Sequence, residues 1–157
     1  MVTPEKIISV LKEKKMKLTL AESCTGGMIS ALLTAVPGCS EVYGGGICSY
    51  SDEVKNQLLG VGNETLTKLG AVSARSASEM AKGALILFGA DVSLSVTGFA
   101  GPDGGTEKNP VGTVFVACAT QEDLILRRFV FKGNRAEVRK KASVRALQIL
   151  EEMLERQ

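Results

Sequence analysis

Apolar side chains recur every three or four positions between residues 3 and 15, and Lys and Glu fill the gaps. This period matches the 3.6 residues of a helical turn, so the segment predicts an amphipathic helix capped by Thr3, with Pro4 at its first position. The same reasoning predicts further helices at about residues 25–36, 51–59, 74–88 and 134–155. Two of these carry a clear apolar face for burial. In the helix at 74–88 the apolar face comprises Ala77, Met80, Ala81, Ala84, Leu85 and Phe88. In the helix at 134–155 it comprises Val138, Ala142, Val144, Leu147, Leu150 and Leu154.

Short apolar runs between the helices have the length of strands. They lie at residues 18–21, 42–50 and 91–96, followed by "GTVFVACAT" and "LILRRFVFK", which flank "QED" as a hairpin. Strands alternating with helices, plus one hairpin, predict an α/β fold. We expect a three-layer α/β/α sandwich with a mixed, mostly parallel sheet of about five strands. Three glycines in "YGGGIC" indicate close approach by another backbone or by a ligand.

The predicted sheet also locates a site. Ligands of such sheets bind at the carboxyl ends of the strands. The segments that carry Ser23, Tyr50 and Thr97 all follow predicted strands. We therefore expect three loops to converge.

Composition narrows the class of protein. With 157 residues, 45% of them apolar and 23% charged, residues 1–157 predict one globular domain. A net charge of +2 without a basic run gives no reason to expect a nucleic-acid polymer as partner. No run approaches the roughly 20 apolar residues of a membrane span, and the N-terminus does not look like a signal peptide, so we expect a cytoplasmic protein. The four cysteines lack CxxC spacing and are expected to be reduced.

The chain contains no histidine. This excludes a Ser-His-Asp catalytic triad and a Cys-His catalytic dyad. It also removes the commonest metal ligand and the commonest general base. Acid–base chemistry must therefore use Lys, Tyr, Cys or a carboxylate.

The segment "ESCTGG" offers two nucleophiles, Ser23 and Cys24, just before a predicted helix. Unpaired N–H groups around Thr25, Gly26 and Gly27 would favour an anion or a developing oxyanion there. A structural interpretation is equally open, in which a hydroxyl only caps the helix and the glycines allow close packing. A helix N-terminus lowers thiol pKa in general, so these residues alone do not choose between the two nucleophiles.

Tyr50 and Lys55 could replace the missing histidine. A lysine kept neutral by burial can activate a serine hydroxyl, and a tyrosine hydroxyl can relay the proton. The alternative is a solvated lysine and an ordinary aromatic residue at the end of a strand.

The loop "TGFAGPDGG" could let backbone amides of Thr97, Gly98 and Gly101 approach a ligand, or could be a rigid turn. Arg135 and Arg139 are four residues apart on the last predicted helix and share a face. Such a pair suits a phosphate or carboxylate, although an exposed charged face is the simpler interpretation.

Taken together, these motifs resemble a known family. "AESCTGG", "PGCSEVYGGGICSYSDEVKNQLLGV", "GAVS", "VTGFAGPDGGTEKNPVGTVFVA" and "FKGNRAEVR" follow the order and spacing of the CinA C-terminal domain family, over about residues 3–154. Its enzymatic members are nicotinamide-nucleotide amidases. This chain departs from the usual pattern at Asp52, where Asn is common, at Cys39, where Ser is common, at "GNR" for "GDR", and at Asn109, which separates a Lys and a Pro that usually adjoin.

The resemblance implies hydrolysis of nicotinamide mononucleotide to nicotinic acid mononucleotide and ammonia, in pyridine nucleotide recycling. It implies Ser23, Tyr50 and Lys55 as catalytic residues, and no cofactor or metal. Larger members carry an extra N-terminal domain, so a stand-alone amidase is expected. Because the chain is a small domain with an apolar final helix, we also expect it to self-associate. The substrate-binding set that we expect comprises Thr25, Gly26, Gly27, Thr97, Gly98, Gly101 and Arg135. A non-catalytic nucleotide-binding module and a serine–lysine amidase for another small amide are the alternatives.

Overall fold

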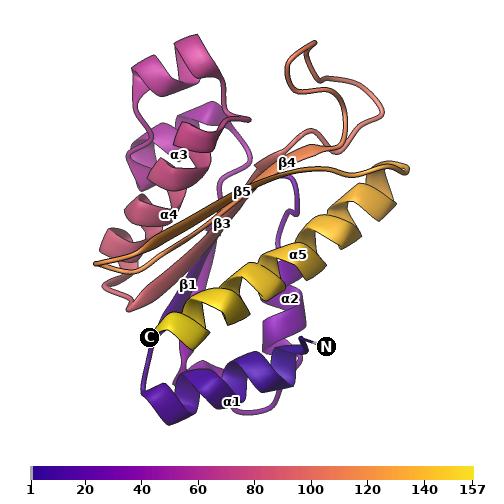
Figure 1. Ribbon diagram of the computed structural model, residues 1–157. Coiled ribbons are helices and arrows are strands. Elements are labelled where there is room, and N and C mark those ends of the chain that lie inside the picture. Colours follow the sequence, from indigo (N-terminus) through magenta and orange to yellow (C-terminus); the bar gives the residue numbers. More distant parts are fainter. Residues whose placement is uncertain (1) are drawn as a thin grey trace.

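The computed structural model describes residues 2–157 and has three layers, with a central sheet between two layers of helices (Figure 1). The strands are β1 (Leu18–Glu22), β2 (Tyr43–Cys48), β3 (Val92–Gly98), β4 (Thr113–Ala119) and β5 (Leu124–Val130). The helices are α1 (Pro4–Lys14), α2 (Met28–Thr34), α3 (Asp52–Leu59), α4 (Ala74–Phe88) and α5 (Arg135–Arg156). Helices α1, α2 and α5 pack together on one face, and α3 and α4 cover the other.

The strand order is β2-β1-β3-β4-β5. Strand β1 is parallel to both β2 and β3, whereas β4 is antiparallel to both of its neighbours. Four strands therefore point the same way and β4 alone runs against them. This confirms the predicted three-layer fold and its mixed sheet.

Capping side chains set the start of four helices. Thr3, Ser51, Ser73 and Asn134 each accept a hydrogen bond from the backbone N–H three residues on. These four helix starts agree closely with those predicted from the sequence. Helix α2 begins three residues later than predicted, because Gly26 and Gly27 have φ of +56° and +96° and cannot join a right-handed helix. A 3₁₀ turn, η1 (Cys39–Glu41), and a π-helical turn, η2 (Thr65–Leu69), were not predicted.

The main core lies between the sheet and the α1, α2 and α5 layer. Two smaller clusters lie beneath α4. The predicted burial of two residues is wrong, since 44% of Val144 and 39% of Phe88 is exposed. Val144 is rotated about 200° around the helix from Ala142, which is buried, and so points away from the sheet. Phe88 lies at the end of α4, against Gly45 on the edge strand β2.

Of the three glycines of β2, Gly46 allows close approach by a backbone. A Cβ atom at Gly46 would lie 2.6 Å from the carbonyl oxygen of Leu20 in the neighbouring strand. The four cysteines are all free thiols, as predicted. Over residues 2–157, no helix combines the length and the apolar character needed to cross a membrane.

Candidate active site

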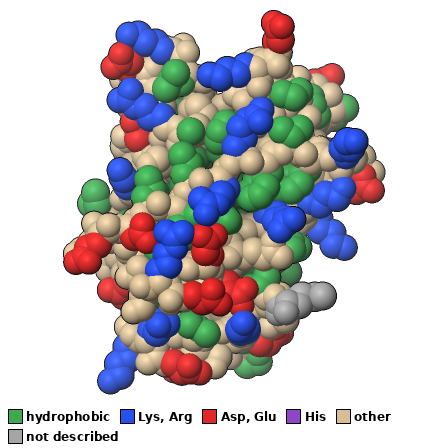
Figure 2. Space-filling model, viewed as in Figure 1, with side chains coloured by type: hydrophobic (Ala, Val, Ile, Leu, Met, Phe, Trp, Pro, Cys, Tyr) green, Lys and Arg blue, Asp and Glu red, His purple; other side chains and the backbone are tan. Residues whose placement is uncertain are grey.

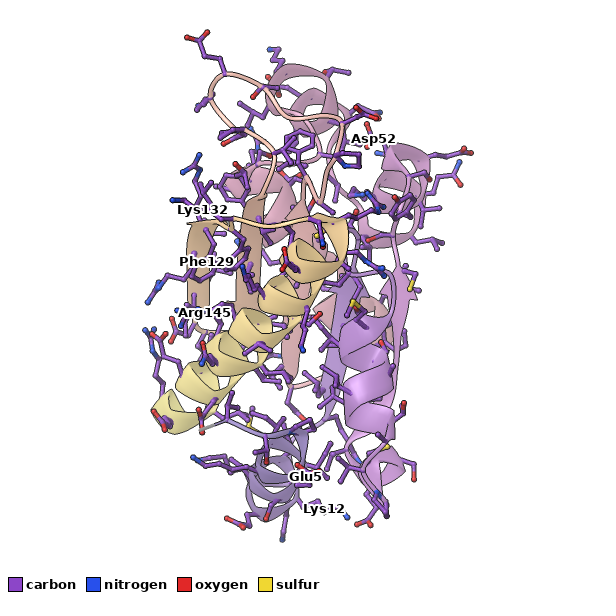
Figure 3. All side chains as sticks on the ribbon, turned by 90° about the vertical axis from the view of Figure 1, so that its right-hand side faces the viewer. Glu5, Lys12, Asp52, Phe129, Lys132 and Arg145 are labelled. Atoms are coloured by element: carbon purple, nitrogen blue, oxygen red, sulfur yellow. The ribbon has the colours of Figure 1, made fainter. Side chains whose placement is uncertain are left out.

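The loops that follow β1, β2 and β3 converge, as predicted, on a cavity of about 250 Å³. Its lining comprises Ser23, Cys24, Tyr50, Asp52, Lys55, Ala71, Val72, Thr97, Gly98, Phe99, Ala100 and Arg135. Figure 3 labels Asp52, which marks the start of α3 beside this cavity. Six of the predicted site residues are thus brought together.

A buried serine–lysine pair forms the floor of the cavity. Ser23 directly follows β1, and its N–H donates to the carbonyl of Val96, which anchors it to β3. Lys55, in α3, is 1% exposed. Its Nζ lies 2.9 Å from Ser23 Oγ and donates a second hydrogen bond of 2.6 Å to the carbonyl of Ser49. The amine is therefore fixed beside the serine hydroxyl.

Burial lowers the pKa of Lys55, because removal from water penalises the ammonium form. Asp52 and Cys24 raise this pKa but do not cancel the effect. Lys55 makes no salt bridge to any other residue in the described range 2–157. A lysine without a buried counter-ion has a larger neutral fraction, and the neutral amine is the form that can accept a proton.

Cys24 is a poorer nucleophile in this environment. Burial raises the pKa of its thiol to about 11, although Lys55 and Arg139 act in the opposite direction. The thiolate is the reactive form, and it is scarce at neutral pH when the pKa is this high. The geometry therefore favours Ser23 over its neighbour.

Glu22, which sequence reasoning missed, occupies the N-terminus of α2. Its buried Oε2 accepts hydrogen bonds from Thr25 Oγ1 at 2.7 Å and from the N–H groups of Gly27 and Ile29 at 3.1 Å. Its Oε1 accepts from the N–H and Oγ of Ser30 at 2.8 and 2.7 Å. The available signal was a carboxylate at the end of an apolar strand, just before a helix start.

This arrangement places part of the predicted binding set away from the cavity. Thr25, Gly26, Gly27 and Gly101 are not among the lining residues. Thr25 donates its hydroxyl and Gly27 its N–H to Glu22, while the carbonyl of Gly101 accepts from Arg135. Within residues 2–157, the N–H groups of Cys24 and Thr25 donate no hydrogen bond to another residue. Thr25 is fully buried and does not line the cavity, so only the amide of Cys24 is placed to meet a ligand there.

The two arginines of α5 have different tasks. Arg139 donates from Nε to the carbonyl of Cys24 at 3.0 Å and from Nη2 to that of Thr25 at 3.1 Å, so it holds the loop that follows Ser23. Arg135 lines the cavity and donates to the carbonyl of Gly101 at 2.8 Å and to Tyr50 Oη at 3.0 Å. Only Arg135 is therefore placed to meet a ligand in the cavity.

Tyr50 lies at the mouth of the cavity, with 64% of its surface exposed. Its hydroxyl is hydrogen-bonded to Arg135, and no hydrogen bond within residues 2–157 joins it to Ser23 or Lys55. The structure thus brings Tyr50 to the site but does not show the proton relay.

At the β3 end of the cavity, Thr97 and Gly98 are held by neighbouring segments, and apolar side chains form part of the wall. Thr97 Oγ1 donates to the carbonyl of Ala71 at 2.9 Å, which fastens the segment before α4 to β3. A Cβ atom at Gly98 would lie 2.7 Å from the carbonyl oxygen of Thr113, so close packing against β4 requires glycine. Sequence reasoning missed Val72 and Phe99 as lining residues. Phe99 lies in the predicted loop, where attention went to the backbone amides of Thr97, Gly98 and Gly101.

The described residues offer little to a metal ion. The chain has no histidine, and residues 2–157 contain no group of three or more Cys, Asp or Glu side chains that could hold one. The nucleophilic and ionisable groups that line the cavity are those of Ser23, Cys24, Tyr50, Asp52, Lys55 and Arg135.

Comparison with known proteins identifies the family. The sequence model of the CinA C-terminal domain matches residues 2–154. A CinA-like protein from Thermotoga sp. strain RQ2 is 45% identical over 150 residues, which is 96% of this chain but 36% of that protein. This chain thus spans about a third of the length of such curated relatives.

Two solved structures agree over nearly the whole of both chains. A CinA superfamily protein from Klebsiella pneumoniae is 36% identical, with a TM-score of 0.94 over 98% of this chain and 96% of its own. The competence/damage inducible protein CihA from Agrobacterium tumefaciens is 37% identical, with a TM-score of 0.93 over 97% and 93%. The chain therefore belongs to the CinA C-terminal domain family.

Proposed function

We propose that this protein hydrolyses the carboxamide of nicotinamide mononucleotide, releasing nicotinic acid mononucleotide and ammonia. The observation that carries the proposal is the 2.9 Å contact between Lys55 Nζ and Ser23 Oγ. Without histidine, a buried amine with a lowered pKa is the base that a serine nucleophile requires. Family membership and the resemblance of the site motifs to nicotinamide-nucleotide amidases support the choice of reaction.

In the first half-reaction, Ser23 Oγ attacks the carboxamide carbon while neutral Lys55 accepts the hydroxyl proton. The tetrahedral intermediate carries negative charge on the former carbonyl oxygen, which we assign the N–H group of Cys24 to stabilise. Lys55 then returns the proton to the amide nitrogen, the C–N bond breaks, and ammonia leaves behind an ester on Ser23.

In the second half-reaction, water attacks the ester carbon and gives its proton to Lys55. The bond to Ser23 Oγ breaks, Lys55 reprotonates the serine, and the carboxylic acid product is released. The relay role of Tyr50 requires its hydroxyl to leave Arg135, because that hydrogen bond holds it at the mouth of the cavity. A phosphate that engages Arg135 would compete for the same donor.

The lining of the cavity suits a mononucleotide with the amide innermost. Val72 and Phe99 offer an apolar wall for a pyridine ring near Ser23. Arg135, the first residue of α5, supplies a fixed positive charge near the mouth of the cavity. We therefore assign Arg135 to the phosphate of the substrate.

Ammonia release from nicotinamide mononucleotide, nicotinamide riboside and nicotinamide tests this assignment. We expect the mononucleotide to be the best substrate. In Arg135→Gln, KM for the mononucleotide should rise about tenfold or more, because a charge-assisted contact is lost, while the riboside should be little affected. Arg145→Gln, which removes an exposed arginine of α5 outside the cavity, is the matched control.

Three results would contradict the proposal. Equal turnover of mononucleotide and riboside would remove the phosphate assignment. Ammonia release from a different small amide only would favour the other serine–lysine amidase. Tight nucleotide binding in calorimetry with no turnover would favour a non-catalytic module.

A further inference from the structure

A second cavity, of about 730 Å³, lies beyond the segment Ala71–Ser73 from the catalytic cavity. It shares no lining residue with the catalytic cavity. Four cations from four separate parts of the chain surround it, and they are Lys68 of η2, Arg75 of α4, Lys108 of the loop before β4, and Arg128 of β5. In Figure 2, Lys and Arg side chains stand on both sides of the notch between the lobe of η2 and the lobe of that loop.

The cavity carries an excess of positive charge. None of its lining residues is acidic. Lys68 and Arg75 each pair with a glutamate one turn away on their own helical segment, at 2.7 and 2.9 Å. Lys108 and Arg128 form no salt bridge within residues 2–157. Two cations therefore remain for a ligand, which matches the roughly −2 charge of a phosphate monoester at neutral pH.

Arg128 is held in place without being neutralised. Its Nε donates to Asn109 Oδ1 at 3.3 Å and its Nη2 to the carbonyl of Lys108 at 3.0 Å. The guanidinium lies over the ring of Phe115, its cross-strand partner, 6.0 Å from the centroid. Asn109 Nδ2 in turn donates to the carbonyl of Val72 at 3.3 Å. A guanidinium fixed by neutral acceptors keeps its charge available and loses little freedom on binding.

The remaining lining gives an apolar surface beside the cations. Leu69 is 51% exposed and lines the cavity with Ala74 and the buried ring of Phe115. The volume lies within the range of about 300–1,000 Å³ that is typical of small-molecule sites. A ligand that fits both features has a phosphate at one end and an apolar or aromatic group at the other.

We propose that this second cavity binds a small phosphorylated molecule of the nucleoside monophosphate class. Arg128 and Lys108 hold the phosphate, and the base or another ring rests against Leu69 and Ala74. The site is independent of Ser23 and Lys55, so it stands or falls separately from the amidase reaction.

Calorimetric titration with AMP tests the proposal, with adenosine and inorganic phosphate as partial ligands. We expect one AMP site on a catalytically silent Ser23→Ala background, and weaker binding of both partial ligands. Arg128→Gln and Lys108→Gln should each weaken AMP binding about tenfold or more. Lys108 makes no side-chain hydrogen bond within residues 2–157, so its variant should fold normally.

Two controls separate this cavity from other arginines. Arg145 also lies over a phenylalanine ring, 5.9 Å from the centroid of Phe129, but outside the cavity, and Figure 3 labels both residues. Arg145→Gln should leave AMP binding unchanged. Absence of AMP binding at millimolar concentration, or unchanged binding in both cavity variants, would overturn the proposal. Loss of binding in Arg135→Gln alone would also overturn it, because AMP would then occupy the catalytic cavity.

Discussion

At the scale of single residues, the proposed chemistry depends on one buried amine. Lys55 has no buried counter-ion within the described chain, and it contacts Ser23 Oγ and a backbone carbonyl. Desolvation is the largest influence on its pKa and lowers it. The rate should therefore rise with pH as Lys55 loses its proton, and should level off below the ordinary pKa of a lysine.

Asp52→Asn tests this electrostatic account. The negative charge of Asp52 favours the protonated form of Lys55 and so raises its pKa. Removing that charge should move the rising limb of the kcat–pH profile to lower pH. Glu53→Gln is the matched control, because it removes an acidic group from the same first turn of α3. A profile that is unchanged by Asp52→Asn, or that moves to higher pH, would speak against Lys55 as the base.

At the scale of elements, the strand-to-helix junction around Ser23 depends on Glu22. Its carboxylate satisfies the N–H groups at the start of α2, while Arg139 holds the carbonyls of the same loop. The junction is thus fixed from both sides, and Ser23 is presented to Lys55 without a flexible loop.

We expect Glu22→Gln to lower the free energy of unfolding by roughly 2–4 kcal/mol, because an amide cannot accept all five hydrogen bonds and loses the charge that strengthens them. Guanidinium denaturation measures this loss. Glu13, which is exposed and accepts only from Ser9 Oγ, gives the control variant Glu13→Gln, with a change within about 0.5 kcal/mol. Equal stability of the two variants would show that the cap is dispensable.

The close packing of α3 on α4 requires a residue without a side chain at position 83. A Cβ atom at Gly83 would overlap the carbonyl oxygen of Leu59, at the end of α3. Gly83→Ala should therefore destabilise the fold by about 1–3 kcal/mol, despite the better helix propensity of alanine. It should also slow turnover, since α3 carries Lys55. Gly44→Ala, where a Cβ meets nothing within 4 Å, should change neither quantity; a similar loss in both variants would refute the packing argument.

At the scale of the whole molecule, hydrophobic periodicity and capping residues predicted the three layers, the hairpin and every helix start except that of α2. It failed where position in space matters more than spacing, as at Val144, which has the right residue type on the wrong side of α5. The missing histidine directed attention to Lys55, and topology brought it to Ser23. The position of Glu22 before a helix start was visible in the sequence, but its hydrogen-bond partners were not, because these are fixed only once β1 and α2 are folded together.

The separate contacts of Arg135 and Arg139 were also not predictable from the sequence. A shared helix face suggested that Arg135 and Arg139 act together, but one lines the cavity and the other braces the loop that follows Ser23. Their separation depends on which loop lies opposite each turn of α5. Residue identity alone does not contain that information.

The most direct test of the account is ammonia release from nicotinamide mononucleotide by the wild type, Ser23→Ala and Cys24→Ala. We predict that Ser23→Ala loses at least about a thousandfold in kcat, because no other activated nucleophile contacts Lys55. Cys24→Ala should stay within a few-fold of the wild type, since its thiol is protonated at neutral pH. Undiminished turnover by Ser23→Ala would contradict the assignment of Ser23 as the nucleophile.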